Sequence, residues 1–588
     1  MYRRGLFEKS ESYFRAAISK QTWKNPNPYD GEPYFNLGLA LLKQNKVEDA
    51  YGAFYKATWN EATQASAFYQ IACIDSRKGE FELAIEHINQ ALIKNYHNIK
   101  ARGLKAIVLR MLGRVEEARV LIYENLKIDK FDYVSYFEIY QISQKESDRD
   151  VLQKMIKQGI NQYLELALDY MQGGFYELAI QILEMCPQKN PLVYYYKGYA
   201  QQLMGNKDGA VRSFEQAQIS DPTCCFPNKI EEILILEMAT GFLEEGSFAY
   251  YYLGNLWYDK GQYKKAVSSW ERSIELNDKF PTAYRNLALA YFNKQENHKQ
   301  ALVYLERAFN IDQTDARVFL ELDQLYKKLN YSLQVRRDKM ENHFTVIESR
   351  DDLMIEYITV LNSLGEYEKA YVLTMGRKFH PWEGGEGKIT SQYVFSLTEM
   401  AKINMVKGQY EEALERLTKA LSYPENLGEG KLPNTQDNII YYHMAQVYMA
   451  LNEDEKVQMY FKKASTGLKE PTDMMFYNDQ PADTIFYQGK AYEAMGMITQ
   501  ANERFDTLIS YAREHMDDVI KIDYFAVSLP DTLIFEENLQ KKNQIHCLYL
   551  QGLGFLGRGE VEKASEYLEL AQTLNVSHQG ISRHLMLI

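Results

Sequence analysis

The stretch that decides the fold lies at residues 248–305 and runs FAYYYLGNLWYDKGQYKKAVSSWERSIELNDKFPTAYRNLALAYFNKQENHKQALVYL. One face of a predicted helix carries residues at i, i+3, i+4 and i+7: Tyr250, Leu253, Gly254 and Trp257. The same pattern returns at Ala288, 34 residues after Gly254. Two short helices, here called helix A and helix B, cannot bury their apolar faces alone, so such units stack into an array.

Within one unit, three positions explain how helix A meets helix B. Gly254 is small, which lets helix B approach closely. Gly261 takes the turn between the helices, where a positive φ costs glycine little. Trp270 is the large packing residue on helix B. The pattern therefore predicts antiparallel helix pairs.

The composition agrees with an array and excludes several classes of protein. The chain has 588 residues, 46% of them hydrophobic, which rules out wholesale disorder. Its net charge of −13 argues against a general nucleic-acid or anionic-membrane binder. It has no run of 18 apolar residues and no apolar stretch near its N-terminus, so we expect a cytoplasmic protein.

The sequence carries no motif that demands a metal, a cofactor or catalysis. Its five cysteines are irregularly spaced and include no C-x-x-C pair, which predicts free thiols. No H-E-x-x-H, phosphate-loop or G-x-S-x-G motif is present. We therefore predict no cofactor, no metal site and, for this chain alone, no enzymatic activity.

The turn positions show how far the array extends. Asn45, Gly79 and Gly113 are spaced 34 residues apart, whereas the charged run Lys145–Asp150 is expected to be a loop. Where the pattern stops and restarts, it predicts a first array at 1–222, an interrupting loop and helix at 223–245, a central array at 246–379, a glycine-rich loop at 380–390 and a third array with longer insertions at 391–588.

The N-terminus begins inside a unit. Gly5, Phe14 and Ala17 match a turn and a helix B, without the helix A that should precede them. A lone helix B exposes an apolar face, which favours a chain cut from something longer over an N-terminal cap.

From about Gly31 to Leu574 the chain resembles the tetratricopeptide repeat (TPR) superfamily. The resemblance implies an all-α, right-handed superhelical solenoid, with a concave groove that is lined by the A helices and binds peptides or partner proteins. Residues 249–388 also resemble large, poorly characterised bacterial proteins in which such an array follows a β-rich, mutarotase-like domain. That domain is absent here, and the resemblance implies a carbohydrate-related context.

Two sets of residues are candidates for binding. Polar and aromatic side chains predicted to face the groove are Tyr251, Asn255, Tyr258, Arg285, Asn286, Asn293 and Arg317. Asn255, Asn286 and Arg317 match part of the carboxylate clamp of peptide-binding TPR domains, but Tyr251 and Glu321 replace two basic residues of that clamp. The alternative to a binding groove is an ordinary solvated face.

The second set lies in the loop HPWEGGEGK, which breaks the repeat. It holds His380, Trp382, Glu383, Glu386 and Lys388. Tryptophan can stack on a sugar ring, and paired carboxylates serve glycoside chemistry. The alternative is a packed loop between repeats.

The sequence thus favours a non-enzymatic scaffold that binds a peptide or partner protein in its groove. The alternative is the helical portion of a carbohydrate-active or carbohydrate-binding protein, with the HPWEGGEGK loop at a sugar site. A third possibility is a module for homo-oligomerisation. No nucleic acid or membrane partner is expected, and the oligomeric state stays open.

Overall fold

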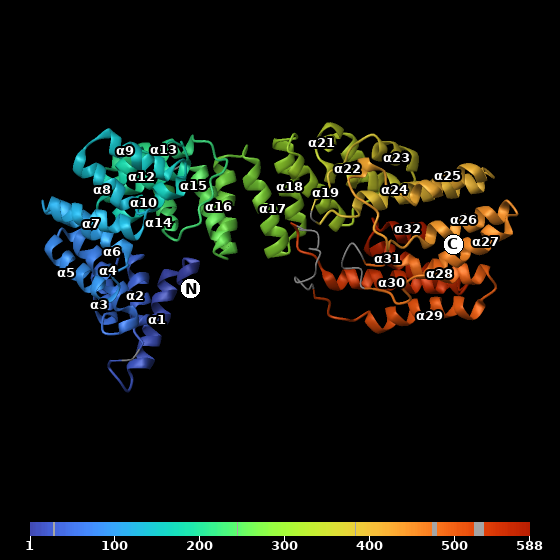
Figure 1. Ribbon diagram of the computed structural model, residues 1–588, viewed down its shortest axis with the longest axis horizontal. Helices are drawn as coiled ribbons and strands as arrows, with labels where there is room; N and C mark the ends of the chain where they lie inside the picture. The colour runs from blue at the N-terminus through green and yellow to red at the C-terminus, as the bar shows by residue number, and fades with distance from the viewer. Residues whose placement is uncertain (28–29, 244, 383, 473–478, 522–533) are drawn as a thin grey trace. The chain divides into compact units, whose positions relative to one another are not determined.

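The computed structural model describes the chain except for residues 28–29, 244, 383, 473–478 and 522–533. The described residues form α-helices and two short 3-10 helices, and none of them lies in a β-strand. The chain divides into two compact units, Met1–Ala283 and Tyr284–Ile588 (Figure 1). The all-α solenoid predicted from the repeat is confirmed.

The first unit begins with the 3-10 helix η1 (Tyr2–Arg4). Its α-helices are α1 (Phe7–Thr22), α2 (Glu32–Leu42), α3 (Val47–Ala57), α4 (Glu61–Lys78), α5 (Phe81–Lys94), α6 (Ile99–Met111), α7 (Val115–Ile128), α8 (Tyr133–Ser143), α9 (Glu146–Ile156), α10 (Ile160–Gln172), α11 (Tyr176–Glu184), α12 (Pro191–Leu203), α13 (Lys207–Gln218), α14 (Glu231–Phe242), α15 (Ser247–Asp259) and α16 (Tyr263–Leu276).

Helix α17 (Pro281–Gln295) contains the division between the units. The second unit continues with α18 (His298–Ile311), α19 (Ala316–Lys328), α20 (Leu333–Glu341), α21 (Phe344–Glu348), α22 (Asp351–Ser363), α23 (Tyr367–Met375), α24 (Lys388–Val406), α25 (Tyr410–Ala420), η2 (Glu425–Leu427), α26 (Asn438–Ala450), α27 (Asp454–Ala464), α28 (Asp483–Ala494), α29 (Ile498–His515), α30 (Leu539–Gly557), α31 (Val561–Leu574) and α32 (Gln579–Leu585).

Helix pairs are held together by a small residue on helix A that meets a large one on helix B. A Cβ atom on Gly254 would lie 2.5 Å from the indole of Trp270, so only glycine fits there. The same relation, with a spacing of 16 residues, joins Gly38 to Phe54, Gly198 to Phe214 and Gly489 to Phe505. This contact explains the close packing of helices within each pair.

The turns between helices occur where the repeat predicts them. Asn45, Gly79 and Gly113 adopt positive φ angles of 57°, 79° and 77°. Gly79 ends α4, where its backbone N–H donates to carbonyls of the last turn. Left-handed conformations at these positions stop helix A and start helix B.

One predicted loop is wrong. The charged run Lys145–Asp150 enters α9 at Glu146 instead of forming a loop. Glu146 and Asp148 lie in the first turn of that helix, where carboxylates interact favourably with the helix dipole. Charge density alone therefore misled the sequence analysis.

The first unit brings distant segments of the chain into contact. The Ser76 hydroxyl of α4 donates to the Gly173 carbonyl after α10 (2.8 Å), and the Arg77 Nε donates to the Gln172 carbonyl (2.7 Å). The N-terminal segment is anchored in the same way, because Arg4 Nη2 donates to the Gly261 carbonyl (2.8 Å). The predicted lone helix B, α1, packs on α2.

Candidate partner-binding surfaces

The candidate groove residues fall in both units. Tyr251, Asn255 and Tyr258 lie on α15 in the first unit. The other four lie in the second unit: Arg285, Asn286 and Asn293 on α17 and Arg317 on α19.

The α15 residues surround the indole of Trp270. Trp270 Nε1 donates to the Asn255 side-chain oxygen (3.0 Å) and lies 3.2 Å from the Tyr251 carbonyl. The Tyr258 ring centroid is 5.6 Å from that of Trp270, and Tyr251 is buried against Phe280. Asn255 and Tyr258 stay half-buried, so they reach the surface while they orient the tryptophan.

On α17 and α19, two arginines share one buried carboxylate. Arg285 makes a bidentate ion pair with Glu321, with both N–O distances at 2.6 Å, and Glu321 is fully buried. Arg317 Nε also donates to Glu321 (3.1 Å), yet its side chain is 64% exposed. Arg285 therefore neutralises a buried charge, whereas Arg317 presents part of its guanidinium to solvent.

Asn293 holds a distant segment of the second unit. Its side-chain amide donates to the Ile534 carbonyl, and its oxygen accepts from the Glu536 N–H, both at 2.8 Å. The structure does not describe residues 522–533, which precede this segment in the insertion predicted at residues 517–542. Asn286 is half-buried on the same helix. Asn293 therefore anchors the end of that insertion.

The HPWEGGEGK loop is held by hydrogen bonds to Asp351 of α22 and by one within the loop. The His380 N–H donates to Asp351 Oδ2 (2.9 Å), and the His380 ring nitrogen lies 3.1 Å from the same oxygen. Glu386 accepts from the Gly384 N–H (2.8 Å), so its carboxylate shapes the loop. Glu383, the other predicted carboxylate, lies outside the described residues.

Trp382 of this loop is half-buried against its own neighbours. A Cβ atom on Gly385 would lie 2.2 Å from the indole, so glycine allows the ring to lie on the backbone. Lys388 Nζ lies 5.8 Å from the centroid of the ring. These contacts are those of a packed loop, and the exposed part of Trp382 is what remains for a ligand.

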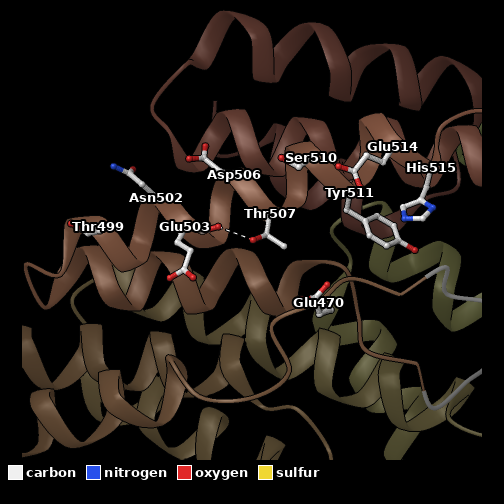
Figure 2. Close-up of a pocket in the computed structure, with 10 residues that line it drawn as sticks. All are labelled: Glu470, Thr499, Asn502, Glu503, Asp506, Thr507, Ser510, Tyr511, Glu514 and His515. Atoms are coloured by element: carbon white, nitrogen blue, oxygen red, sulfur yellow. Dashed lines mark hydrogen bonds between the residues drawn. The ribbon is translucent and has the colours of Figure 1, made fainter.

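An open cleft of about 740 Å³ lies along α29, a helix B of the second unit (Figure 2). It is lined by Glu470, Thr499, Asn502, Glu503, Asp506, Thr507, Ser510, Tyr511, Glu514 and His515. Two of its carboxylates face arginines at long distance, Glu503 with Arg504 (3.7 Å) and Asp506 with Arg558 (3.6 Å). Four of the residues that line the cleft are acidic, and the cleft is open to solvent. None of the predicted binding residues lines it.

The second unit has a further surface that sequence analysis missed, and it is occupied by the last helix. Side chains of α32 contact four A helices of this unit: α22, α24, α28 and α30. Gln579 donates to the Thr359 carbonyl (3.3 Å) and lies 2.9 Å from the Gln392 side chain. His584 lies against Phe486 and Tyr487. We call this surface, with Thr359, Gln392, Glu399, Asp483, Tyr487 and Tyr549, the A-face of the second unit.

Arg583 is the charged centre of this contact. Its Nε lies 2.8 Å from Glu399 Oε1, its Nη1 lies 3.4 Å from Asp483 Oδ2, and its guanidinium carbon is 4.1 Å from the centroid of the Phe395 ring. Burial opposes the charged guanidinium, but the two carboxylates hold the pKa of Arg583 above its usual value. Burial also raises the pKa of Asp483, only partly offset by Arg583.

Three histidines lie around α32: His443 and His584 are buried, and His578 is half-buried. Burial, followed by Arg583 and Lys402, lowers the pKa of His584 to about 3. Burial and Lys402 lower the pKa of His443 to about 4, and burial with His546 lowers that of His578 to about 4. All three are therefore neutral near pH 7. The signal in the sequence was the polar SRH triplet inside an apolar tail.

Two properties of the described residues bear on the class of protein. Within the described part of the chain, no group of three or more His, Cys, Asp or Glu side chains is arranged to hold a metal ion. None of the described helices combines the length and the hydropathy that a membrane span requires.

Parts of the sequence match models of known protein families. Models described as TPR repeat or tetratricopeptide repeat match residues 69–132, 254–295 and 483–515, in both units. With helix pairs in the same register, these matches support a place for the chain in the TPR superfamily. The TPR fold is that of a protein-interaction scaffold and supports binding of protein or peptide partners.

Individual relatives are distant. A TPR repeat-containing protein of Methanocaldococcus jannaschii is 22% identical over 72% of this chain and 74% of its own length. The human protein O-mannosyl-transferase TMTC3 is 25% identical over 37% of this chain, which spans only 25% of that protein. The solved TPR protein YrrB is 16% identical over 40% of this chain and 97% of its own, with a TM-score of 0.16.

Proposed function

We propose that this chain is a non-enzymatic scaffold that binds a protein or peptide partner on the faces of its A helices. The observation that carries the proposal is α32 itself. In the second unit, a helical segment already lies across four A helices, held by a backbone carbonyl of α22 and by side chains of α24, α28 and α30. A surface that accommodates one helix in this way has the chemistry to accommodate a partner's segment.

On α19, we propose Arg317 as a contact residue for such a partner. Its side chain is 64% exposed, and Glu321 takes only part of its hydrogen-bonding capacity. A guanidinium with donors left over suits an acidic side chain or a carboxylate. On α15, we propose that Asn255 and Tyr258 form the corresponding surface of the first unit.

The test is a pull-down of partners from cells with the full chain and two matched variants. Arg317→Gln changes an ion pair at i,i+4 on a helix A, in which the arginine is exposed and Glu321 is buried. Lys419→Gln changes an exposed pair of the same spacing, with Glu415, on the helix B α25. We expect Arg317→Gln to lose at least one partner that Lys419→Gln keeps. If both variants keep every partner of the wild type, the assignment of the groove on α19 is wrong.

A carbohydrate contact at loop 380–388 is the second candidate function. It is supported by the partial exposure of Trp382, beside the glycines Gly384 and Gly385. A glycan array with wild type and Trp382→Ala tests it. Sugar binding that disappears in the variant supports this candidate, and identical responses of the two proteins rule it out.

A further inference from the structure

The contacts of α32 define what kind of segment fits the A-face of the second unit. A Cβ atom on Gly580 would lie 2.6 Å from the Tyr549 hydroxyl, so glycine is required there. Ile581 and His584 are fully buried, and Arg583 is nearly so. Ser582, between them, is only half-buried. The surface therefore selects the order glycine, apolar, any residue, arginine, histidine.

The arginine of this order is the most specific element. Its guanidinium faces carboxylates from two different helices, Glu399 of α24 and Asp483 of α28, and lies over the Phe395 ring. The guanidinium donates to Asp483 Oδ2 (3.4 Å), pairs by charge with Glu399 and stacks on the ring, a combination that a lysine ammonium cannot make. The A-face is thus a receptor for a guanidinium presented on a short helix.

We propose that the A-face of the second unit binds a short helical segment of a partner protein with the side-chain order of α32, and that α32 occupies this site until the partner displaces it. This inference rests on the proposed scaffold function, since it names the partner's chemistry at one of the A-helix surfaces.

Displacement is physically reasonable because α32 is a weak helix by itself. It has only seven residues, and helices that short are not stable without packing. Residues Met586, Leu587 and Ile588 beyond it are exposed. The linker is held by Asn330 at the Val576 N–H (2.8 Å), by Arg336 at the Ser577 hydroxyl (3.1 Å) and by the His578 ring, whose centroid lies 4.9 Å from that of Tyr549. Once released, α32 loses its structure and leaves Glu399 and Asp483 open to a partner.

Because α32 is joined covalently to the A-face, it competes strongly with any free peptide for that surface. A segment joined by a short linker competes at an effective concentration on the order of millimolar. A partner peptide in solution therefore binds the wild-type chain poorly unless α32 is weakened. A change in α32 that removes its guanidinium should expose the site to a second copy of the same peptide.

The experiment titrates a fluorescein-labelled synthetic peptide of residues 575–588 into the full chain and follows fluorescence anisotropy. We expect the Arg583→Ala chain to bind the peptide at least about tenfold more tightly than the wild-type chain, since its own α32 competes less well. A peptide that itself carries the Arg583→Ala change should bind the Arg583→Ala chain at least about tenfold more weakly than the unchanged peptide.

A thermal melt first establishes that the variant chain is folded. If it is not, Gln579→Ala replaces it, because that change removes only the contacts to Thr359 and Gln392. Equal binding of the peptide to wild-type and variant chains, or equal binding of the two peptides to the variant, overturns the proposal. The titration needs no natural partner, so its failure leaves the groove assignment on α19 intact. Likewise, a pull-down in which Arg317→Gln loses no partner does not affect the result of the titration, which tests the A-face alone.

Discussion

Arg583 and Glu399 lie 2.8 Å apart, although 184 residues separate them in the sequence. Both side chains are withdrawn from solvent, and Asp483 approaches the same guanidinium from a third helix. The pair joins the last helix of the chain to the A helices of the second unit. The last helix therefore covers part of the A-face of the second unit.

Loss of this ion pair should destabilise the second unit. Removing one partner of a buried pair leaves the other charge uncompensated, so we expect Arg583→Ala to lower the free energy of unfolding by about 3–5 kcal/mol. Most of this loss should appear as release of α32. Urea denaturation of the full chain, followed by circular dichroism, measures it.

Two further variants control this prediction. Arg558→Ala removes an arginine that is one-third exposed and 3.6 Å from Asp506, and it should cost less than about 1 kcal/mol. Glu399 keeps its ion pair with Lys402 (2.8 Å) when Arg583 is removed, so Asp483 is the carboxylate that loses its arginine. Adding Asp483→Asn to Arg583→Ala should therefore recover part of the stability. A double variant no more stable than Arg583→Ala would show that Asp483 is not the group left unpaired.

Acid should release α32 before it unfolds the rest of the chain. Folding lowers the pKa of His443 and His578 to about 4 and that of His584 to about 3, from an ordinary value of 6.5. Their contribution to stability is therefore complete above pH 6.5 and is lost as the pH falls toward 4. One unit of pKa shift corresponds to about 1.4 kcal/mol, so protonation of the three histidines should lower the free energy of unfolding substantially.

Charged groups around these rings act on the histidine pKa values in both directions. Arg583 and Lys402 oppose protonation of His443 and His584, whereas Glu399 favours it, and Asp483 favours protonation of His578. Urea midpoints between pH 7.5 and 4.5 test the prediction. His584→Gln should flatten the profile, since glutamine does not titrate. The same pH dependence in wild type and His584→Gln would assign the effect to other groups.

The packing of helix A on helix B predicts opposite outcomes for two glycine substitutions. Gly254→Ala places a Cβ atom 2.5 Å from the buried Trp270 indole and should cost about 1–3 kcal/mol. Gly52→Ala in α3 meets no atom within 4 Å and should stabilise the chain by up to about 1 kcal/mol, because alanine favours the helix. Thermal melts of both variants give the signs, and a stabilising Gly254→Ala would contradict the packing account.

Trp382 should behave as a structural residue of its loop. Its indole lies on Gly385 and near Lys388, so Trp382→Ala should lower the melting temperature of the full chain by a few degrees. Differential scanning calorimetry measures the shift. An unchanged melting temperature would mean that the indole contributes no packing, and would leave ligand binding as its remaining role.

The architecture could be predicted because repeat contacts are local. Gly254 meets Trp270, and the turns at Asn45 and Gly79 recur at fixed spacing, so periodicity alone reveals them. The site could not be predicted in the same way. The pairing of Arg285 with Glu321 depends on adjacent repeats, and that of Arg583 with Glu399 on the closure of a whole unit. Hydrophobic periodicity does not predict either of these ion pairs.

The central claim is that the A-face of the second unit is a binding surface and that α32 is an occupant which can leave it. Native-state hydrogen exchange of the full wild-type chain, read by mass spectrometry, tests it most directly. We predict that the amides of α32 exchange through an opening of lower free energy than those of α30, which lies in the core of the same unit. If the amides of both helices exchange only through one common unfolding event, α32 is a fixed part of the core and the claim is wrong.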